Sequence, residues 1–130
     1  MSQEKRPLPH PDPEVDEARG YITDAVDALD ALGVRVERSW LDPKGPVDAT
    51  IVTDSFALVW DEWRGWVRGD FVSGRQGERT VLRNLTELGG GLLLDPRELA
   101  VLARDGRTVA PAGRRAADAR DGLFDGLRRY

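Results

Sequence analysis

The side chains best suited to binding chemistry are tryptophans and arginines crowded into the middle of the chain. Trp60, Trp63 and Trp66 lie close together, and Arg64 and Arg68 fall among and just beyond them. Tryptophan and arginine are enriched at binding hot spots, so this region is a candidate contact surface for another protein. The same residues could stack on nucleobases. The alternative places Trp60 and Trp66 in the core or in cross-strand pairs, with Arg68 over an aromatic ring.

A second candidate is the loop Ser73-Gly74-Arg75-Gln76-Gly77, which we predict to join a strand to a helix. The free amides and the dipole of a helix start favour an anion. Arg75, with Arg79 one turn on, could hold a phosphate or carboxylate through paired hydrogen bonds. We therefore predict that Ser73, Arg75, Gln76 and Arg79 bind a ligand. The alternative is that the glycines only shape the connection and that Arg75 pairs with a nearby acid.

The third candidate is the C-terminal segment, whose apolar residues recur at helical spacing. On one side of such a helix lie Leu123, Phe124, Leu127 and Tyr130, with arginines around them. Gly122 and Gly126 would make an isolated helix unstable. The segment could fold on a partner, pack on its own domain, or serve as a disordered spacer.

Catalytic side chains are scarce. The chain has no cysteine, which excludes thiol nucleophiles, disulfides and zinc–thiolate sites. Its only histidine, His10, lies among prolines. Asp61 and Glu62 are adjacent, and neighbours on a strand point to opposite faces, so they are not a natural acid–base pair. We predict no catalytic site, no metal site and no cofactor, with carboxylate chemistry as the remaining alternative for an enzyme.

Composition and charge favour one small domain without a strong attraction to nucleic acid. The chain has 130 residues, of which 40% are hydrophobic, and a net charge of −4. Nucleic-acid-binding domains usually have a basic footprint. No apolar run suits a signal peptide or a membrane span, so we expect a cytoplasmic protein that does not contact a membrane.

These candidates must be positioned by a fold that we predict to be α+β. We expect a disordered tail over 1–13, a single domain over 14–106, and an Arg/Ala/Gly-rich tail over 107–130 that is helical when docked. Within the domain, the patterns predict an N-terminal helix, an antiparallel meander of about four strands, and two further helices. The predicted segments, in order, are a helix over 14–33, strands over 34–40, 49–53, 56–60 and 66–72, a helix over 78–88, an extended run over 90–94, and a helix from Pro96 to about Gly106.

The hairpin around Gly65 determines which faces the aromatic residues occupy. With Gly65 in the left-handed conformation, the predicted register places Trp60 opposite Arg68 and Glu62 opposite Trp66. The second face then carries Ala57, Val59, Val67 and Phe71, and we expect that face to be the core.

Several short motifs resemble a family of small streptomycete-type α+β proteins classed as a domain of unknown function. The motifs are ALVWDE at 57–62, GW at 65–66, FVSGRQG at 71–77, RTVL at 79–82, and LGGG at 88–91 before Asp95-Pro96. The likeness covers about residues 14–106. It implies an actinobacterial, cytosolic, accessory or regulatory protein and transfers no site residue.

Taken together, the sequence leaves the function unknown and favours a non-catalytic protein-interaction or regulatory module. A protein partner is expected, and a second copy of the chain is one candidate. The alternative is a regulator that binds a nucleotide or nucleic acid through the basic loop and Arg64, Arg68, Arg75 and Arg79, although the net charge makes nucleic acid the less favoured partner.

Overall fold

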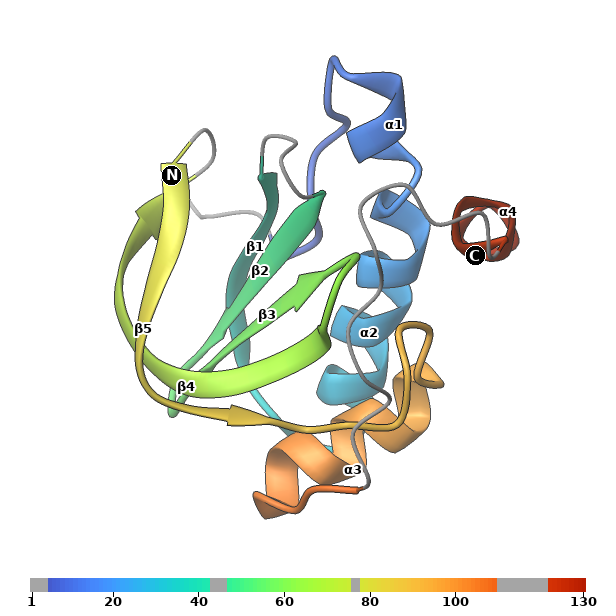
Figure 1. Ribbon diagram of the computed structural model, residues 1–130. Coiled ribbons are helices and arrows are strands. Elements are labelled where there is room, and N and C mark those ends of the chain that lie inside the picture. The colour runs from blue at the N-terminus through green and yellow to red at the C-terminus, as the bar shows by residue number, and fades with distance from the viewer. Residues whose placement is uncertain (1–4, 43–46, 76–77, 110–121) are drawn as a thin grey trace.

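The computed structural model describes residues 5–42, 47–75, 78–109 and 122–130. Along the chain, a continuous run of strands follows one pair of helices and precedes another (Figure 1). In chain order they are α1 (Pro13–Asp16), α2 (Arg19–Ala31), β1 (Val36–Asp42), β2 (Asp48–Thr53), β3 (Ala57–Asp61), β4 (Gly65–Arg75), β5 (Glu78–Glu87), α3 (Pro96–Asp105) and α4 (Leu123–Leu127).

The sheet is a meander in which each strand pairs with its sequence neighbour, in the order β1-β2-β3-β4-β5. Every pairing is antiparallel. The predicted α+β class and antiparallel sheet are therefore confirmed. Among the described residues the sheet has five strands, one more than predicted.

The additional strand is β5, and the prediction of a helix over 78–88 is wrong. Val81, Leu82 and Leu85 recur at intervals that suit a helix, but this segment pairs along β4 instead. Asn84 has a positive φ of 58°, and the register slips beside it. Such a bulge breaks the alternation of side chains by which a strand is recognised. The helical pattern in the sequence was therefore a coincidence of spacing.

The sheet is strongly curved. Helices α2 and α3 cover one face, and the long strands β4 and β5 sweep round and away from them (Figure 1). The pairing of these two strands is irregular at three places, which allows the ribbon to bend. As a result, the far end of the β4–β5 ribbon folds over the face of the sheet opposite the helices, where Thr80 meets Thr50.

Each face of the sheet packs against its own apolar cluster. The main cluster lies between the sheet and the helices and includes Tyr21, Ile22, Leu29, Leu58, Trp60, Trp66, Leu88 and Leu99. The smaller cluster lies inside the curve and contains Trp40, Val52 and Ala57, with Phe71 and Leu82 packed against it. Both faces are thus buried, at least in part.

The β3–β4 hairpin corrects two predictions. Gly65 is left-handed, with φ at 81°, as predicted, but Trp60 pairs with Trp66 and Arg68 pairs with Leu58. The division into faces was right, but the choice of main core was wrong, because the tryptophan face packs against the helices. The tryptophan rings bury more apolar area than the Ala and Val side chains of the other face, so the tryptophan face forms the main core.

The segment between β5 and α3 is not the extended run predicted over 90–94. Gly89, Gly90 and Gly91 all have positive φ, and a turn follows at 92–93. Helix α3 begins and ends as the sequence predicts. Asp95 accepts a hydrogen bond from the amide of Arg97, and Gly106 closes the helix in the left-handed conformation.

The N-terminal residues 5–12 lie beside α2 and β1. Arg6 forms an ion pair with Asp27 of α2 at 2.6 Å, and the hydroxyl of Ser39 donates to the carbonyl of Lys5. Asp12 caps α1 by accepting a hydrogen bond from the amide of Glu14. Residues 1–4 fall outside the described part of the chain.

Candidate functional site

The predicted aromatic surface is largely internal. Trp60 and Trp66 are both 0% exposed, so their rings are not available to a partner in this fold. The indole of Trp60 donates to the carbonyl of Leu92 at 2.7 Å, and the indole of Trp66 donates to the hydroxyl of Tyr21 at 3.0 Å. The alternative that these two rings are core residues is therefore correct, and their burial gives no support to the predicted role in binding.

Tyr21 of α2 is the residue around which the aromatic rings gather. Its ring meets Trp60 edge-on at 5.9 Å and lies tilted against Trp66 at 6.0 Å. Its hydroxyl donates to the carbonyl of Leu94 at 2.5 Å. Burial raises the pKa of this phenol, and the hydrogen bond from Trp66 opposes the rise only in part. The group therefore stays protonated and keeps its donor role at neutral pH.

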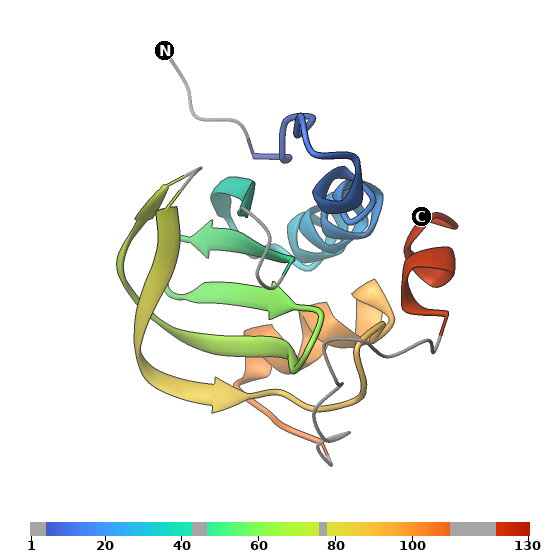
Figure 2. The ribbon, with the colours of Figure 1, turned by 45° about the horizontal axis from the view of Figure 1, so that its top comes forward.

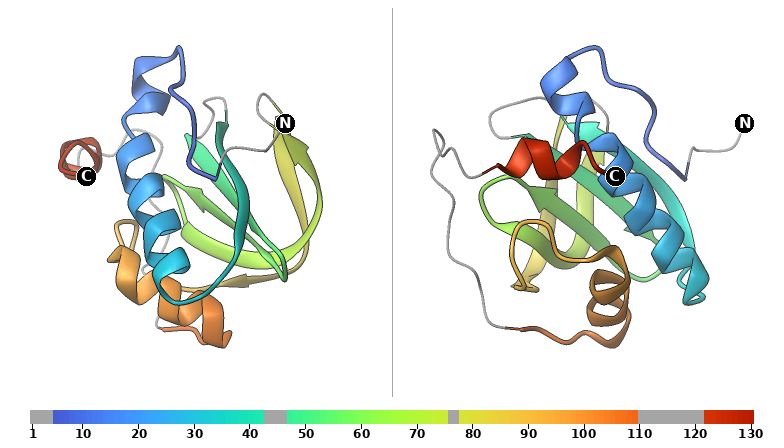
Figure 3. Two further views of the ribbon diagram at one scale, coloured as in Figure 1. Left: turned by 180° about the vertical axis from the view of Figure 1, so that it is seen from behind. Right: turned by 90° about the vertical axis from the view of Figure 1, so that its right-hand side faces the viewer.

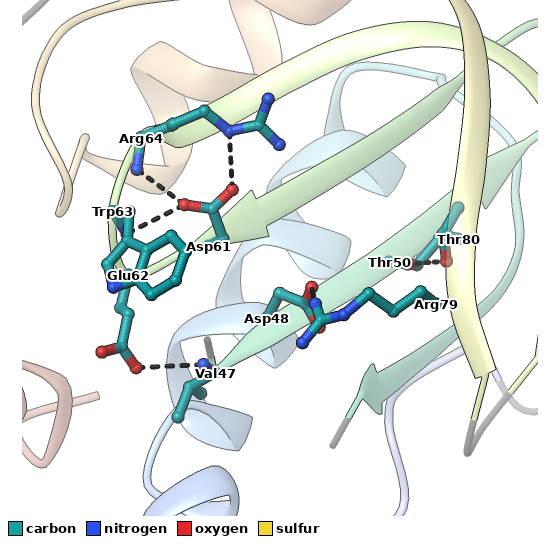
Figure 4. A network of polar contacts seen from close by, with 9 residues as sticks. All are labelled: Val47, Asp48, Thr50, Asp61, Glu62, Trp63, Arg64, Arg79 and Thr80. Carbon is teal, nitrogen blue, oxygen red and sulfur yellow. Dashed lines mark hydrogen bonds and ion pairs between the residues drawn. The ribbon is translucent and has the colours of Figure 1, made fainter. Parts of the chain in front are cut away.

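The β3–β4 loop is fixed by its own carboxylates (Figure 4). One oxygen of Asp61 accepts from the amides of Trp63 and Arg64, and the other accepts from the Arg64 guanidinium at 2.8 Å. The carboxylate of Glu62 accepts from the amide of Val47 at 3.0 Å. Both acids are buried and hold backbone in place, as expected of a polar hairpin end. Trp63, half-buried at the loop, keeps part of its surface in solvent.

The other predicted arginines are each engaged within the chain. Arg68 donates to the carbonyl of Ala103 at 3.0 Å and lies over the ring of Phe56. Arg75 pairs with Glu78 at 3.0 Å, and Arg79 pairs with the nearly buried Asp48 at 2.5 Å. Together with the Arg64–Asp61 pair, these contacts hold neighbouring parts of the domain together. Arg68 joins β4 to α3, and Arg79 joins β5 to β2.

The predicted anion site has no helix start to support it. Ser73 is an exposed residue of β4, and Arg75 and Arg79 stand on either side of a strand-to-strand connection. Gln76 lies outside the described residues. The prediction of a strand-to-helix loop is wrong, because β5 occupies the place of the expected helix. The helix-dipole argument for a bound phosphate therefore does not apply here.

The C-terminal segment, by contrast, lies against the domain. Helix α4 runs beside α2, and the chain ends next to α2 (Figures 2 and 3). Leu123 and Leu127 are 5% and 1% exposed and join the main apolar cluster. The ring of Tyr130 meets Tyr21 edge-on at 4.9 Å. The side chain of Phe124 is outside the described part of the structure. Three of the four predicted docking residues thus contact their own domain.

Two glycines allow the segment to approach closely. A Cβ added at Gly20 would collide with the backbone of Tyr130, with the carbonyl carbon only 2.7 Å away. A Cβ at Gly126 would lie 2.5 Å from a methyl group of Leu93, the end of a flexible side chain. Gly20 costs helix stability in α2, and the contact with Tyr130 gives that residue a structural reason.

Ion pairs hold the rim of this contact. Arg128 pairs with Glu17 at 3.0 Å and also bonds to Asp125 on its own helix. The hydrogen bond with Glu17 raises the pKa of Arg128. Exposed pairs of this kind contribute little to stability, so the leucines and Tyr130 carry the contact.

A cleft of about 530 Å³ lies next to the segment, where α3 crosses the C-terminal end of α2. Its lining residues are Asp24, Asp27, Ala28, Ala31, Leu32, Asp95, Pro96, Arg97, Val101 and Tyr130. These residues come from three separate parts of the chain, so no local pattern in the sequence indicates that they lie together. The one available signal was the run of aspartates along α2, which is typical of any solvated helix face.

A known protein family matches most of the chain. A model described as a family of unknown function, DUF6292, matches residues 21–105. The chain belongs to the DUF6292 family. No curated protein and no solved structure matches it. The resemblance to a family of unknown function is thereby confirmed, and actinobacterial origin stays a prediction.

The DUF6292 match begins at Tyr21 within α2 and covers the rest of that helix, the whole sheet and α3, and it leaves Gly20, α1 and α4 outside. Tyr21, Trp60 and Trp66 are therefore part of the family region, whereas Leu123, Leu127 and Tyr130 are not. The DUF6292 region supplies Tyr21 and Leu93 to the surface that α4 contacts, whereas Gly20, α1 and the docked helix itself lie beyond it. Among the described residues, no helix has the length and apolarity needed to cross a membrane.

Proposed function

We propose that this DUF6292 domain is a non-catalytic protein-interaction module that binds short amphipathic helical segments. The observation that carries the proposal is α4, a helix of the same chain that is seated on the domain through Leu123, Leu127 and Tyr130. Helix-in-groove recognition uses apolar anchors at intervals of three and four residues. The docked segment follows that pattern.

The receiving surface has features that suit a helix rather than a random contact. It is formed by α1, α2 and the segment between β5 and α3, all of which are fixed by the main apolar cluster. Gly20 admits a backbone at close range, and Tyr21 offers a ring edge. We name this surface the α4 face. Its occupant defines the ligand class as a short helix with leucines one turn apart and a following aromatic residue.

The side chains that could support catalysis are used to hold the structure, which favours a non-catalytic role. Asp61 and Glu62 accept hydrogen bonds from backbone amides in the hairpin. Asp48 lies in an ion pair with Arg79. Groups of this kind serve as acids or bases only when they can reach a substrate proton.

The test uses the full chain with the tail released. Leu123→Asp combined with Leu127→Asp places two charges in the apolar contact, so α4 should leave the α4 face while the rest of the domain stays folded. A peptide of residues 122–130 is then titrated, and amide shifts of Gly20, Tyr21 and Leu93 are followed. We expect saturable binding to the released chain and binding at least about tenfold weaker to the wild type, where the tethered segment competes.

The control is a peptide with the same two Leu→Asp changes, which should not bind. Circular dichroism and thermal unfolding of the released chain confirm that the domain is intact. If the folded, released chain shows no shifts at about 1 mM peptide, a concentration that would reveal even weak affinity, the proposal is wrong.

A further inference from the structure

The cleft between α2 and α3 is a second surface on the helical side of the domain. Its floor is apolar, formed by Ala28, Ala31 and Leu32 of α2 and by Val101 of α3. Alanines at positions 28 and 31 are one turn apart and leave a shallow groove along α2. Helices can approach to interaxial distances of about 8 Å where contact side chains are small. The floor therefore suits another helix laid along α2.

The rim of the cleft is acidic. Asp24 and Asp27 stand one turn apart on α2, and Asp95 stands at the start of α3, against Arg97 as the basic residue of the lining. The Asp24 carboxylate is exposed, and within the described parts of the chain it forms no ion pair and accepts no hydrogen bond. Carboxylates beside an apolar floor attract a cationic partner by complementary charge.

One arginine of the chain already forms an ion pair with this rim. The guanidinium of Arg6, from the N-terminal residues, donates to the Asp27 carboxylate at 2.8 Å, with a second nitrogen at 2.6 Å. Both side chains are well exposed, at 58% and 46%. An arginine side chain thus reaches this rim from outside α2, while Asp24, one turn away, is left for another cation.

We propose that the α2–α3 cleft binds a basic amphipathic helix of a partner protein. Apolar side chains of the partner enter between Ala31 and Val101, and its lysines or arginines meet Asp24 and Asp95. A second copy of the chain offers no such helix among its described residues. Helix α2 is acidic, and α3 carries Glu98 and Asp105 beside its arginines. Helix α4, which has Arg128 beside it, is already seated on its own α4 face, so we take the partner to be a different protein.

This proposal is separate from the α4 face but shares Tyr130, whose ring lies on Tyr21 and also lines the cleft. Binding in the cleft requires α4 to be docked, so that Tyr130 is in place, but it does not require α4 to be released from its face. Amides of Gly20 and Leu93 report the α4 face, and amides of Ala31 and Val101 report the cleft. The two proposals can therefore fail independently.

The experiment titrates the full wild-type chain with a Leu/Lys amphipathic peptide of about 14 residues, long enough to form a helix on binding. We expect shifts at Ala31 and Val101 and weaker binding at higher salt. The matched peptide with glutamate in place of lysine should bind at least about tenfold more weakly, because it reverses every rim contact.

Two pairs of variants localise the binding. Asp24→Lys should weaken it by about fivefold or more, whereas Glu37→Lys, the same charge change on exposed β1, should leave it unchanged. Val101→Glu should weaken it by at least about tenfold through loss of the apolar floor, and Val81→Glu on β5 is its control. Arg97→Glu should strengthen binding by about as much as Asp24→Lys weakens it.

Several outcomes would overturn the proposal. The proposal is wrong if the peptide causes shifts only outside the cleft, or if no binding is seen at about 1 mM peptide. It is also wrong if the glutamate peptide binds as tightly as the lysine peptide, or if Asp24→Lys and Glu37→Lys weaken binding equally. Titration with spermidine, a flexible cation without an apolar face, distinguishes a general cation site. If spermidine binds as tightly as the peptide, the apolar floor has no role and the inference of a helical partner is wrong.

Discussion

The β3–β4 hairpin and the C-terminal segment both combine aromatic rings with arginines, yet they use them in opposite ways. In the hairpin, Trp60 and Trp66 are sealed inside and their indole N–H groups are bonded to other parts of the domain. In the segment, Tyr130 stays 44% exposed and two leucines make the buried contact. The difference teaches that the hairpin builds the domain, whereas the segment is attached to a surface that is already formed.

The largest expected effect tests whether the hairpin is part of the domain itself. Trp66→Ala should lower the free energy of unfolding by about 3–5 kcal/mol, because it empties a fully buried site and leaves the Tyr21 hydroxyl with one contact fewer. Urea unfolding followed by far-UV circular dichroism measures the change. Trp63→Ala, at a half-buried loop position, is the control and should cost much less. Equal losses would remove the distinction between core and loop tryptophans.

The next effect concerns the arginines of the curved sheet. Arg79→Ala should destabilise the fold by about 1–2 kcal/mol, because it removes the Arg79 guanidinium from the nearly buried Asp48 carboxylate. The double change Asp48→Asn with Arg79→Ala should recover part of that loss, since no charge is then buried. A double-mutant cycle by chemical denaturation gives the coupling. If Arg79→Ala has no effect, the arginine is available for other contacts and its bracing role is disproved.

Tyr21 lies where the two regions meet, and its ionisation gives a pH test. Burial raises the pKa of Tyr21 above its ordinary value of 10.0, so the unfolded chain loses this proton first as pH rises. Stability contributed by the protonated phenol is complete below about pH 10 and falls above it, by up to about 1.4 kcal/mol per pH unit. Urea unfolding at several alkaline pH values measures the slope. Tyr21→Phe should show a shallower decline, and an identical slope would contradict a buried phenol.

The smallest expected effect on stability is that of Gly20→Ala, and its sign depends on whether residues 122–130 are present. In the full chain, Gly20→Ala should displace Tyr130, because the new Cβ meets its backbone. With residues 122–130 deleted, the same change should stabilise α2 by up to about 1 kcal/mol, the helix preference of alanine over glycine. Thermal unfolding of the four proteins measures both. If Gly20→Ala has the same effect in both backgrounds, the segment does not occupy the place described.

Much of the fold was predictable because local signals agreed with the tertiary structure. The β-branched run at 49–53, the capping by Asp95 and the end at Gly106 appear as expected, whereas the single helix predicted over 14–33 is divided into α1 and α2 by a turn at 17–18. The helix predicted over 78–88 failed for a physical reason. Val81, Leu82, Leu85 and Leu88 fit a helical stripe, and the bulge at Asn84 concealed the alternation of a strand.

The candidate sites were harder to predict, because their properties depend on partners that are distant in sequence. Whether Trp60 faces solvent is decided by α2 and by the carbonyl of Leu92, neither of which the hairpin sequence reveals. Arg79 was expected near a helix start but pairs with Asp48, 31 residues away. The cleft joins Asp24, Asp95 and Tyr130, whose proximity depends on the placement of three separate elements.

The division of the interior into two clusters also bears on how the molecule opens. Among the contacts of the described residues, the far end of the β4–β5 ribbon meets the small cluster around Trp40, pairs Thr80 with Thr50 and pairs Arg79 with Asp48. The main cluster, with its helices, holds the rest of the sheet. Regions with few buried contacts exchange their amide hydrogens through partial opening, below the energy of global unfolding. We therefore expect the amides of β5 near Thr80 to exchange before those of the tryptophan layer.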